Sequence, residues 1–136
     1  MRRIPATGDM SVAECWDRLQ GAACGFVALS ARALPVVLPV QYYVQDGLIV
    51  ICLGPDAPFH PVLEDVVVAF AVESINPATS SGWTVHVQGI LRADPGPLPA
   101  CPTGAGRIAH MEPIAVTGWH VELCPLRTAG RPTPAT

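Results

Sequence analysis

Four histidines are the side chains of this sequence best suited to proton transfer or metal binding. They are His60, His86, His110 and His120. No two of them lie one helical turn apart. A pair such as His86 and His120 could share a metal ion only if their strands are neighbours and both side chains point the same way. Lone histidines on strands are more often surface residues or hydrogen-bonded ones, so the sequence predicts no metal site.

Five cysteines are the second set of reactive side chains. An odd number without a CxxC pair argues against a zinc ribbon or a disulfide framework. Cys15, Cys24 and Cys52 stand among apolar residues, where a thiol packs as a small hydrophobic group. Cys101 and Cys124 each precede a proline, as cysteines that ligate haem iron sometimes do. With fifteen prolines in the chain, chance explains such pairs well, so haem is kept as a minor alternative.

Standard catalytic motifs are absent, and composition narrows the function instead. The chain has no phosphate-binding loop, GxGxxG, HExxH or GxSxG, and its carboxylates form no pair suited to acid and base catalysis. All eight basic residues are arginine and the formal net charge is −3, which argues against a nucleic-acid binder. Half of the residues are apolar and 14% are charged, which predicts a folded chain whose surface is partly covered by a second copy.

The elements that must position these residues begin with a short helix. Ser11 and Glu14 have the spacing of a capping box, in which each satisfies a backbone N–H of the first turn. Apolar residues follow at helical spacing, and Gly21 is the expected stop. This helix is expected to cover one end of a core.

From Gly25 onward the pattern is typical of strands. Asp46-Gly47 between two apolar runs predicts a two-residue hairpin turn. Pro35 and Pro39 predict that their strand lies at an edge or carries a bulge. Alternation in the fifth strand places Trp83, Val85, Val87 and Leu91 on one side and Thr84, His86 and Gln88 on the other. The expected strands are Phe26 to Ser30, Leu34 to Val44, Leu48 to Leu53, Val66 to Val72, Trp83 to Leu91, and a last pair, Ile108 to Met111 and Val116 to Leu123.

One helix and about six strands at hairpin spacing predict a mainly β fold, a small antiparallel barrel with flanking helices that plug it. The expected single domain spans residues 10–124, after a flexible arm at residues 1–9 and before a flexible tail rich in proline and threonine at residues 125–136. The paired arginines at positions 2 and 3 are not followed by an apolar segment, so no signal peptide is expected and the predicted location is the cytoplasm.

Several short motifs follow one another in a definite order along the chain. The most specific runs from Ser74 to Gly89 and contains Asn76-Pro77-Ala78-Thr79 followed by Gly82-Trp83-Thr84-Val85. The others are Ser11 to Cys15, Gly25, Pro35 to Tyr42, Asp46-Gly47, and Pro113 to Gly118. Together, over roughly residues 10 to 123, they resemble the pyridoxamine 5′-phosphate oxidase-like proteins, flavin-binding split barrels common in actinobacteria.

This resemblance implies a six-stranded, homodimeric split barrel and an oxidoreductase that uses FMN on an unknown small molecule. Some members of the family use a deazaflavin, and a few bind haem. The flavin ring of the family lies along the second strand, which here comprises Val37, Leu38, Pro39 and Val40. Trp83 and Gln88 are the candidates to reach the ring from the partner chain.

The positions that usually hold the flavin phosphate are unusual in this sequence. Members of the family typically carry an Arg-Thr pair on the third strand and a Ser/Thr-Lys pair a few residues later. The corresponding residues here are Cys52, Leu53, Ala57 and Pro58. None offers the cation or hydroxyl that a phosphate needs, and Asp56 adds a negative charge beside them. The usual FMN phosphate anchors are therefore predicted to be missing.

Three readings other than a flavoprotein follow from the missing anchors. A flavin-free barrel could bind or transform an apolar or aromatic small molecule in its interface pocket, with His60 and His86 as the first candidates for proton transfer. Tyr42, Tyr43, Leu53, Phe59 and Trp83 would line such a pocket. The chain could also be a structural or regulatory dimer without a ligand, or a haem-binding protein.

Overall fold

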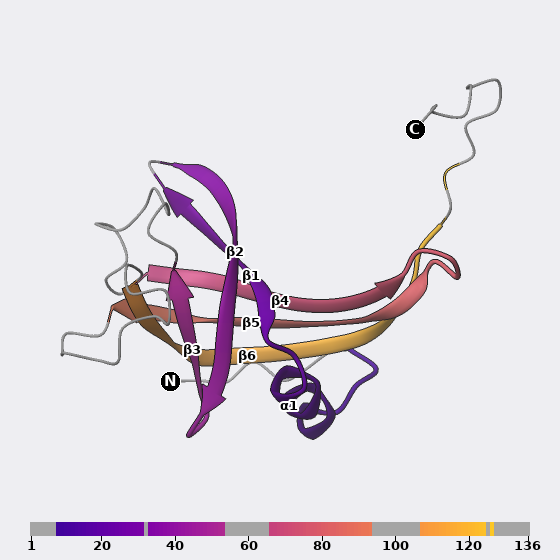
Figure 1. The fold of residues 1–136 in the computed structure, drawn as a ribbon, viewed down its shortest axis with the longest axis horizontal. Coiled ribbons are helices and arrows are strands. Elements are labelled where there is room, and N and C mark those ends of the chain that lie inside the picture. Colours follow the sequence, from indigo (N-terminus) through magenta and orange to yellow (C-terminus); the bar gives the residue numbers. More distant parts are fainter. Residues whose placement is uncertain (1–7, 32, 54–65, 94–106, 125, 127–136) are drawn as a thin grey trace.

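The structure is a computed structural model that describes residues 8–31, 33–53, 66–93, 107–124 and 126 (Figure 1). It contains one helix, α1 (Val12–Gln20), and six strands: β1 (Cys24–Ala31), β2 (Leu34–Gln45), β3 (Leu48–Leu53), β4 (Val66–Asn76), β5 (Ser81–Ala93) and β6 (Arg107–Glu122). The predictions for the arm at residues 1–7 and for the tail at 125 and 127–136 concern residues outside the described ranges. The same holds for the predictions on Asp56, Ala57, Pro58, Phe59, His60 and Cys101.

The six strands form a closed antiparallel barrel in the order β1-β2-β3-β6-β5-β4. The three long strands β4, β5 and β6 run side by side, and β1, β2 and β3 cross them steeply (Figure 1). β1 closes the barrel because it pairs with β2 along one edge and with β4 along the other. The predicted mainly β antiparallel barrel is confirmed, and of the expected flanking helices the described residues contain one, α1.

Among the described residues, the half of β2 that contains its prolines has a paired strand on one side only. Pro35 and Pro39 pair with β1, whereas the pairing of β2 with β3 begins at Gln41. A proline has no N–H to donate to a second neighbour, so it fits this half better than the doubly paired half. The prediction of a local edge is thus confirmed.

The turn between β2 and β3 is the one expected from Asp46-Gly47. Asp46 has a φ of 52° and Gly47 a φ of 76°, so both lie in the left-handed region that a type I′ turn requires. Asp tolerates this conformation and glycine adopts it without steric cost. The turn sets the register in which Gln45 pairs with Leu48.

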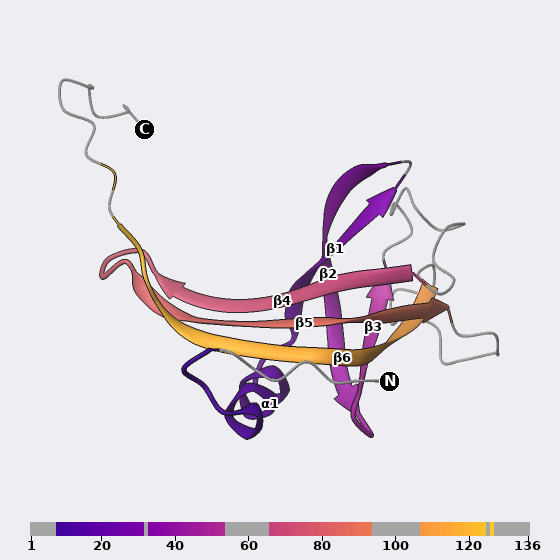
Figure 2. The ribbon, with the colours of Figure 1, turned by 180° about the vertical axis from the view of Figure 1, so that it is seen from behind.

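The helix α1 lies beside the long strands and closes one end of the core (Figure 2). The side chain of Ser11 accepts a hydrogen bond from the Glu14 backbone N–H at 3.1 Å, as expected for the capping residue. Two residues of this helix, Cys15 and Leu19, are fully buried in the core. The Tyr42 hydroxyl donates to the Leu19 carbonyl at 2.6 Å and so ties β2 to the helix.

Three sequence expectations about strands and cysteines are corrected. The last pair of strands is one continuous strand, β6, with a bulge opposite Gln88 and Gly89 that absorbs one extra residue. Cys24 is exposed and Cys52 is half-buried and disulfide-bonded, so neither packs as a buried thiol. Alternating burial explains both positions, because these two residues face outward on β1 and β3.

The segment before α1 is attached to the end of β6. The Asp9 carboxylate accepts hydrogen bonds from the His120 backbone N–H at 2.9 Å and from its ring Nδ1 at 3.2 Å. The Met10 N–H donates to the Gly118 carbonyl at 3.1 Å. The backbone hydrogen bond from His120 holds the pKa of Asp9 below its ordinary value. The chain is therefore bound to the barrel at Asp9 and Met10, before α1 begins.

Candidate functional site

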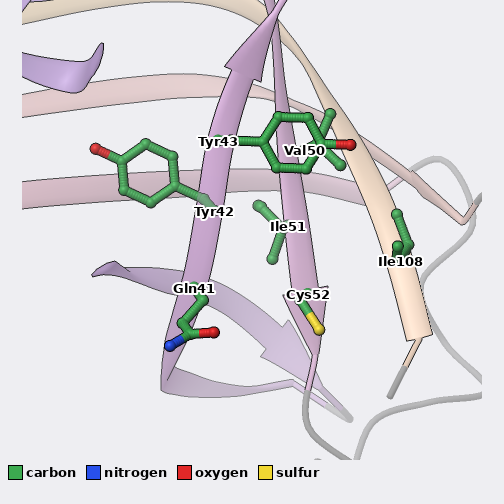
Figure 3. Close-up of a pocket in the computed structure, with 7 residues that line it drawn as sticks. All are labelled: Gln41, Tyr42, Tyr43, Val50, Ile51, Cys52 and Ile108. Carbon is green, nitrogen blue, oxygen red and sulfur yellow. The ribbon is translucent and has the colours of Figure 1, made fainter. Parts of the chain in front are cut away.

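An apolar groove lies on the outer face of β2, β3 and β6 (Figure 3). Its volume is about 170 Å³, and its lining is Gln41, Tyr42, Tyr43, Val50, Ile51, Cys52 and Ile108. Tyr43 and Val50 are cross-strand partners, as are Cys52 and Ile108. The groove thus depends on β6 lying beside β3, a contact between segments far apart in the sequence.

The two adjacent tyrosines of β2 have different roles. Tyr42 points into the barrel, where its ring meets Phe70 edge-on with centroids 4.8 Å apart. Burial raises the pKa of Tyr42 to about 12, because the phenolate is poorly solvated there. Tyr43 points outward with half of its surface exposed, so its ring is available to a ligand in the groove.

The predicted ring-binding segment of β2 presents alternate residues to opposite faces. Val37 and Pro39 are exposed on the outer face, whereas Leu38 and Val40 point toward the core. Gln41 and Tyr43 continue the outer series into the groove. A ligand along this strand would therefore meet the side chains of Val37 and Pro39 and only the backbone of the other two.

The candidate ligand-binding residues of β5 also point to opposite faces of the sheet. Gln88 and His86 lie on the outer face, and Trp83 lies on the face that carries α1, with the Arg18 guanidinium 5.1 Å from its ring centroid. Trp83 lines a separate, shallow hollow with Ser81, Gly82, His120, Val121 and Glu122. Within one chain, Trp83 and Gln88 therefore cannot contact the same side of one ligand.

Cross-strand register brings several predicted residues onto two parallel rows of the outer face. One row is Val37, Ala28, Ala69, Gln88 and Ala115. The next row is Pro39, Phe26, Ala71, His86 and Thr117. The alanines between the larger side chains leave this part of the sheet flat, so β2 and β5 candidates share one surface.

His86 packs against an aromatic neighbour on that surface. Its ring meets the Trp119 ring edge-on, with centroids 4.8 Å apart. Partial burial lowers the pKa of His86 below its ordinary value, against the opposing charge of Glu73. The imidazole is thus held toward its neutral form, which is the form able to accept a proton.

His86 and His120 do not form the metal pair considered from the sequence. Their strands are neighbours, but His120 pairs with Trp83 and shares its face, whereas His86 faces outward. Among the described residues, no three His, Cys, Asp or Glu side chains gather as metal ligands. No helix within the described ranges is long and apolar enough to cross a membrane.

The predicted phosphate-anchor positions are described only in part. Cys52 lies at the edge of the groove, and Leu53 is the last residue of β3. Sequence reasoning missed four of the lining residues: Gln41, Val50, Ile51 and Ile108. Ile108 enters the groove through the pairing of β6 with β3, which only the structure shows. The residues that are described fit a planar apolar group better than a phosphate at this end of the groove.

The closed six-stranded antiparallel barrel with one described helix has the architecture expected of the split-barrel class of proteins. A scan against protein families matches residues 11–94 to the pyridoxamine 5′-phosphate oxidase family. Because this match covers more than half of the chain, the chain belongs to that family. Among curated proteins, no relative matches it.

Solved structures with the same fold include flavin-binding proteins of low sequence identity. The FAD-binding protein from Mycobacterium smegmatis is 19% identical with a TM-score of 0.68, over 86% of this chain and 100% of that one. A FAD-binding protein from Mesorhizobium loti is 16% identical with a TM-score of 0.62, over 80% and 94%. The FAD and heme binding protein from Mycobacterium smegmatis is 17% identical with a TM-score of 0.60, over 91% and 92%.

Proposed function

We propose that this protein binds a flavin and acts as an oxidoreductase on a small molecule. The observation that carries the proposal is the apolar groove beside the outer face of β2, in a chain of the pyridoxamine 5′-phosphate oxidase family. Tyr43, Val50 and Ile108 offer the flat apolar contact that an isoalloxazine ring requires. A bound flavin would supply the hydride chemistry, and the chain would bind and orient it.

The names of structural neighbours support a flavin but leave its kind open. Two of them are FAD-binding proteins and one binds both FAD and heme. The resemblance seen in the sequence favours FMN. FMN and FAD share the ring and the first phosphate, so the groove side chains described above suit either.

We further propose that the active form is a homodimer. A groove of about 170 Å³ is smaller than the roughly 300–1,000 Å³ of sites that enclose a ligand, so the described residues of one chain supply only part of the walls. Phe26, Val37 and Val67 are 46%, 63% and 69% exposed on neighbouring strands β1, β2 and β4. A second copy would cover this apolar surface. A mass of 14.3 kDa by light scattering would overturn the dimer.

The test of flavin binding is a titration of the purified protein with riboflavin, FMN and FAD, followed by flavin fluorescence and visible absorption. We expect saturable binding of at least one flavin, and weaker binding by the Tyr43→Ala variant. Tyr43 is exposed, so this variant should fold normally, as circular dichroism would check. A protein that binds none of the three flavins would overturn the proposal.

A further inference from the structure

The hollow beside Trp83 is a second candidate site, separate from the groove on β2, β3 and β6. It lies where β5 begins and β6 ends, and its lining is Ser81, Gly82, Trp83, His120, Val121 and Glu122. Its volume is about 440 Å³, which falls within the roughly 300–1,000 Å³ of small-molecule sites. The proposed flavin does not occupy this hollow, so its chemistry is considered by itself.

Two cross-strand pairs build the hollow. Trp83 pairs with His120, and Ser81 pairs with Glu122. The pairs are two residues apart on each strand, so their side chains share the face that carries α1, in rows about 7 Å apart. Trp83 is half-buried and Glu122 is exposed. A small ligand can therefore contact the indole ring and the carboxylate at the same time.

Three of the polar side chains around the hollow offer lone pairs. The Asp9 carboxylate lies 3.2 Å from His120 Nδ1, which favours a proton on this nitrogen and a lone pair on Nε2. Glu122 has a carboxylate, which only accepts hydrogen bonds. The Ser81 hydroxyl lies 2.8 Å from the Thr79 hydroxyl and still has a lone pair to offer. The complementary ligand brings N–H donors and a positive charge.

A contact within the chain shows which kind of cation suits this place. Arg18 of α1 has its Cζ 5.1 Å from the centroid of the Trp83 ring. The electron-rich face of an indole attracts a planar guanidinium in this way. A ligand cation beside the same ring is attracted by Glu122 and repelled by Arg18, so these two residues act on it in opposite directions.

We propose that the hollow binds a small planar organic cation of the amidinium or guanidinium class. The apolar part of the ligand lies against Trp83, and its N–H groups face Glu122 and His120. This ligand carries the charge opposite to that of a flavin phosphate. The site also lies on the α1 side of the sheet, away from the outer face on which the groove lies, so the two sites do not compete.

Benzamidine and benzamide are the probes for this site. Benzamidine is a planar aromatic cation at neutral pH, and benzamide is an uncharged analogue of nearly the same shape. The chain has three tryptophans, whose indole N–H groups give three signals in a ¹⁵N-correlated NMR spectrum. We expect benzamidine to shift the Trp83 signal with a Kd on the order of 1 mM. Benzamide should bind about tenfold more weakly, because it lacks the charge.

Two substitutions should change benzamidine binding in opposite directions. Glu122→Gln removes the attracting charge and should weaken binding about threefold, whereas Arg18→Gln removes the repelling charge and should strengthen it about twofold. Glu73→Gln is the matched control for Glu122→Gln. Glu73 is also exposed, but it lies two residues from Ala71 of β4, which pairs with the outward-facing His86. This control should bind benzamidine like the wild type.

Trp83→Phe identifies the Trp83 signal by removing it. If that variant does not fold, Trp16→Phe and Trp119→Phe identify the signal by elimination. An equal response to benzamide and benzamidine, a shift confined to the other two tryptophans, or unchanged binding by Glu122→Gln would each overturn the site. Wild-type protein that binds benzamidine but no flavin overturns only the proposed function, and the reverse result overturns only this site.

Discussion

At the scale of residues, the hydroxyl of Tyr42 makes the contact that joins the barrel to its helix. It donates to the Leu19 carbonyl at 2.6 Å within the core. Tyr42→Phe removes the donor and leaves a buried carbonyl without it, so we expect the free energy of unfolding to fall by about 1–2 kcal/mol. Denaturant unfolding measures this loss. Tyr43→Phe is the control, because the exposed Tyr43 should be replaced without measurable change.

The raised pKa of Tyr42, about 12, also predicts a dependence on pH. In the unfolded chain a tyrosine loses its proton near pH 10, whereas in the fold it keeps the proton longer. The stability that this difference contributes is fully present below pH 10 and is lost as the pH rises toward about 12. Wild-type protein should therefore lose stability over this range more steeply than Tyr42→Phe. Parallel profiles for the two proteins would contradict the assignment.

The lowered pKa of His86 predicts a loss of stability at mildly acidic pH. Burial lowers its pKa below the ordinary value of 6.5, so the folded chain resists protonation of this ring. Its contribution to stability is present above pH 6.5 and is lost as the pH falls through the lower, folded pKa. An NMR titration of the imidazole should place its pKa below 6.5, and Trp119→Ala should raise it by admitting water. A pKa at or above 6.5 in the wild type would refute this.

At the scale of elements, the contact of α1 with β6 depends on a close approach at Gly118. A Cβ at this position would lie 2.6 Å from Cys15 Sγ and 3.0 Å from Met10 Sδ. Gly118→Ala should therefore push the helix outward and lower the free energy of unfolding by about 1–3 kcal/mol. Adding Cys15→Ala should restore part of the loss, because it removes the nearest atom. Thermal or denaturant unfolding measures both effects.

Gly21→Ala is the control for that substitution. A Cβ at Gly21 would lie 3.5 Å from the nearest atom, the Asp17 carbonyl oxygen, and Gly21 has an ordinary helical conformation. This variant should unfold like the wild type. If Gly118→Ala were as stable as Gly21→Ala, the helix would not be packed against β6 as closely as described.

At the scale of the whole molecule, the proposed dimer predicts where a charge would separate two copies. Val67 of β4 is 69% exposed on the apolar outer surface. Val67→Asp should therefore give a monomer of 14.3 kDa by light scattering, while the wild type has twice that mass. Val12→Asp is the control, because Val12 is also exposed but lies on α1, and it should remain dimeric. If the Val67→Asp variant were still a dimer, the interface would not include Val67.

The sequence alone determined the local features of this protein. Asp46-Gly47 defined a hairpin, Ser11 and Gly21 marked the ends of the helix, and alternation in β5 assigned its faces correctly. These features depend on backbone sterics, on capping hydrogen bonds and on the two-residue period of a strand, all of which act between near neighbours. The motifs along the chain also predicted the family, which the match over residues 11–94 confirms.

The tertiary structure decided which of these elements meet. β3 lies beside β6, so Ile108 enters the groove. His120 lies opposite Trp83 and on its face of the sheet, so His120 and His86 cannot bind one metal ion together. Such pairings join distant segments, and they are set by barrel closure and burial of one strand face, which no local pattern encodes. The sequence therefore predicted some residues of the candidate site, and the strand register of the closed barrel showed which other residues lie beside them.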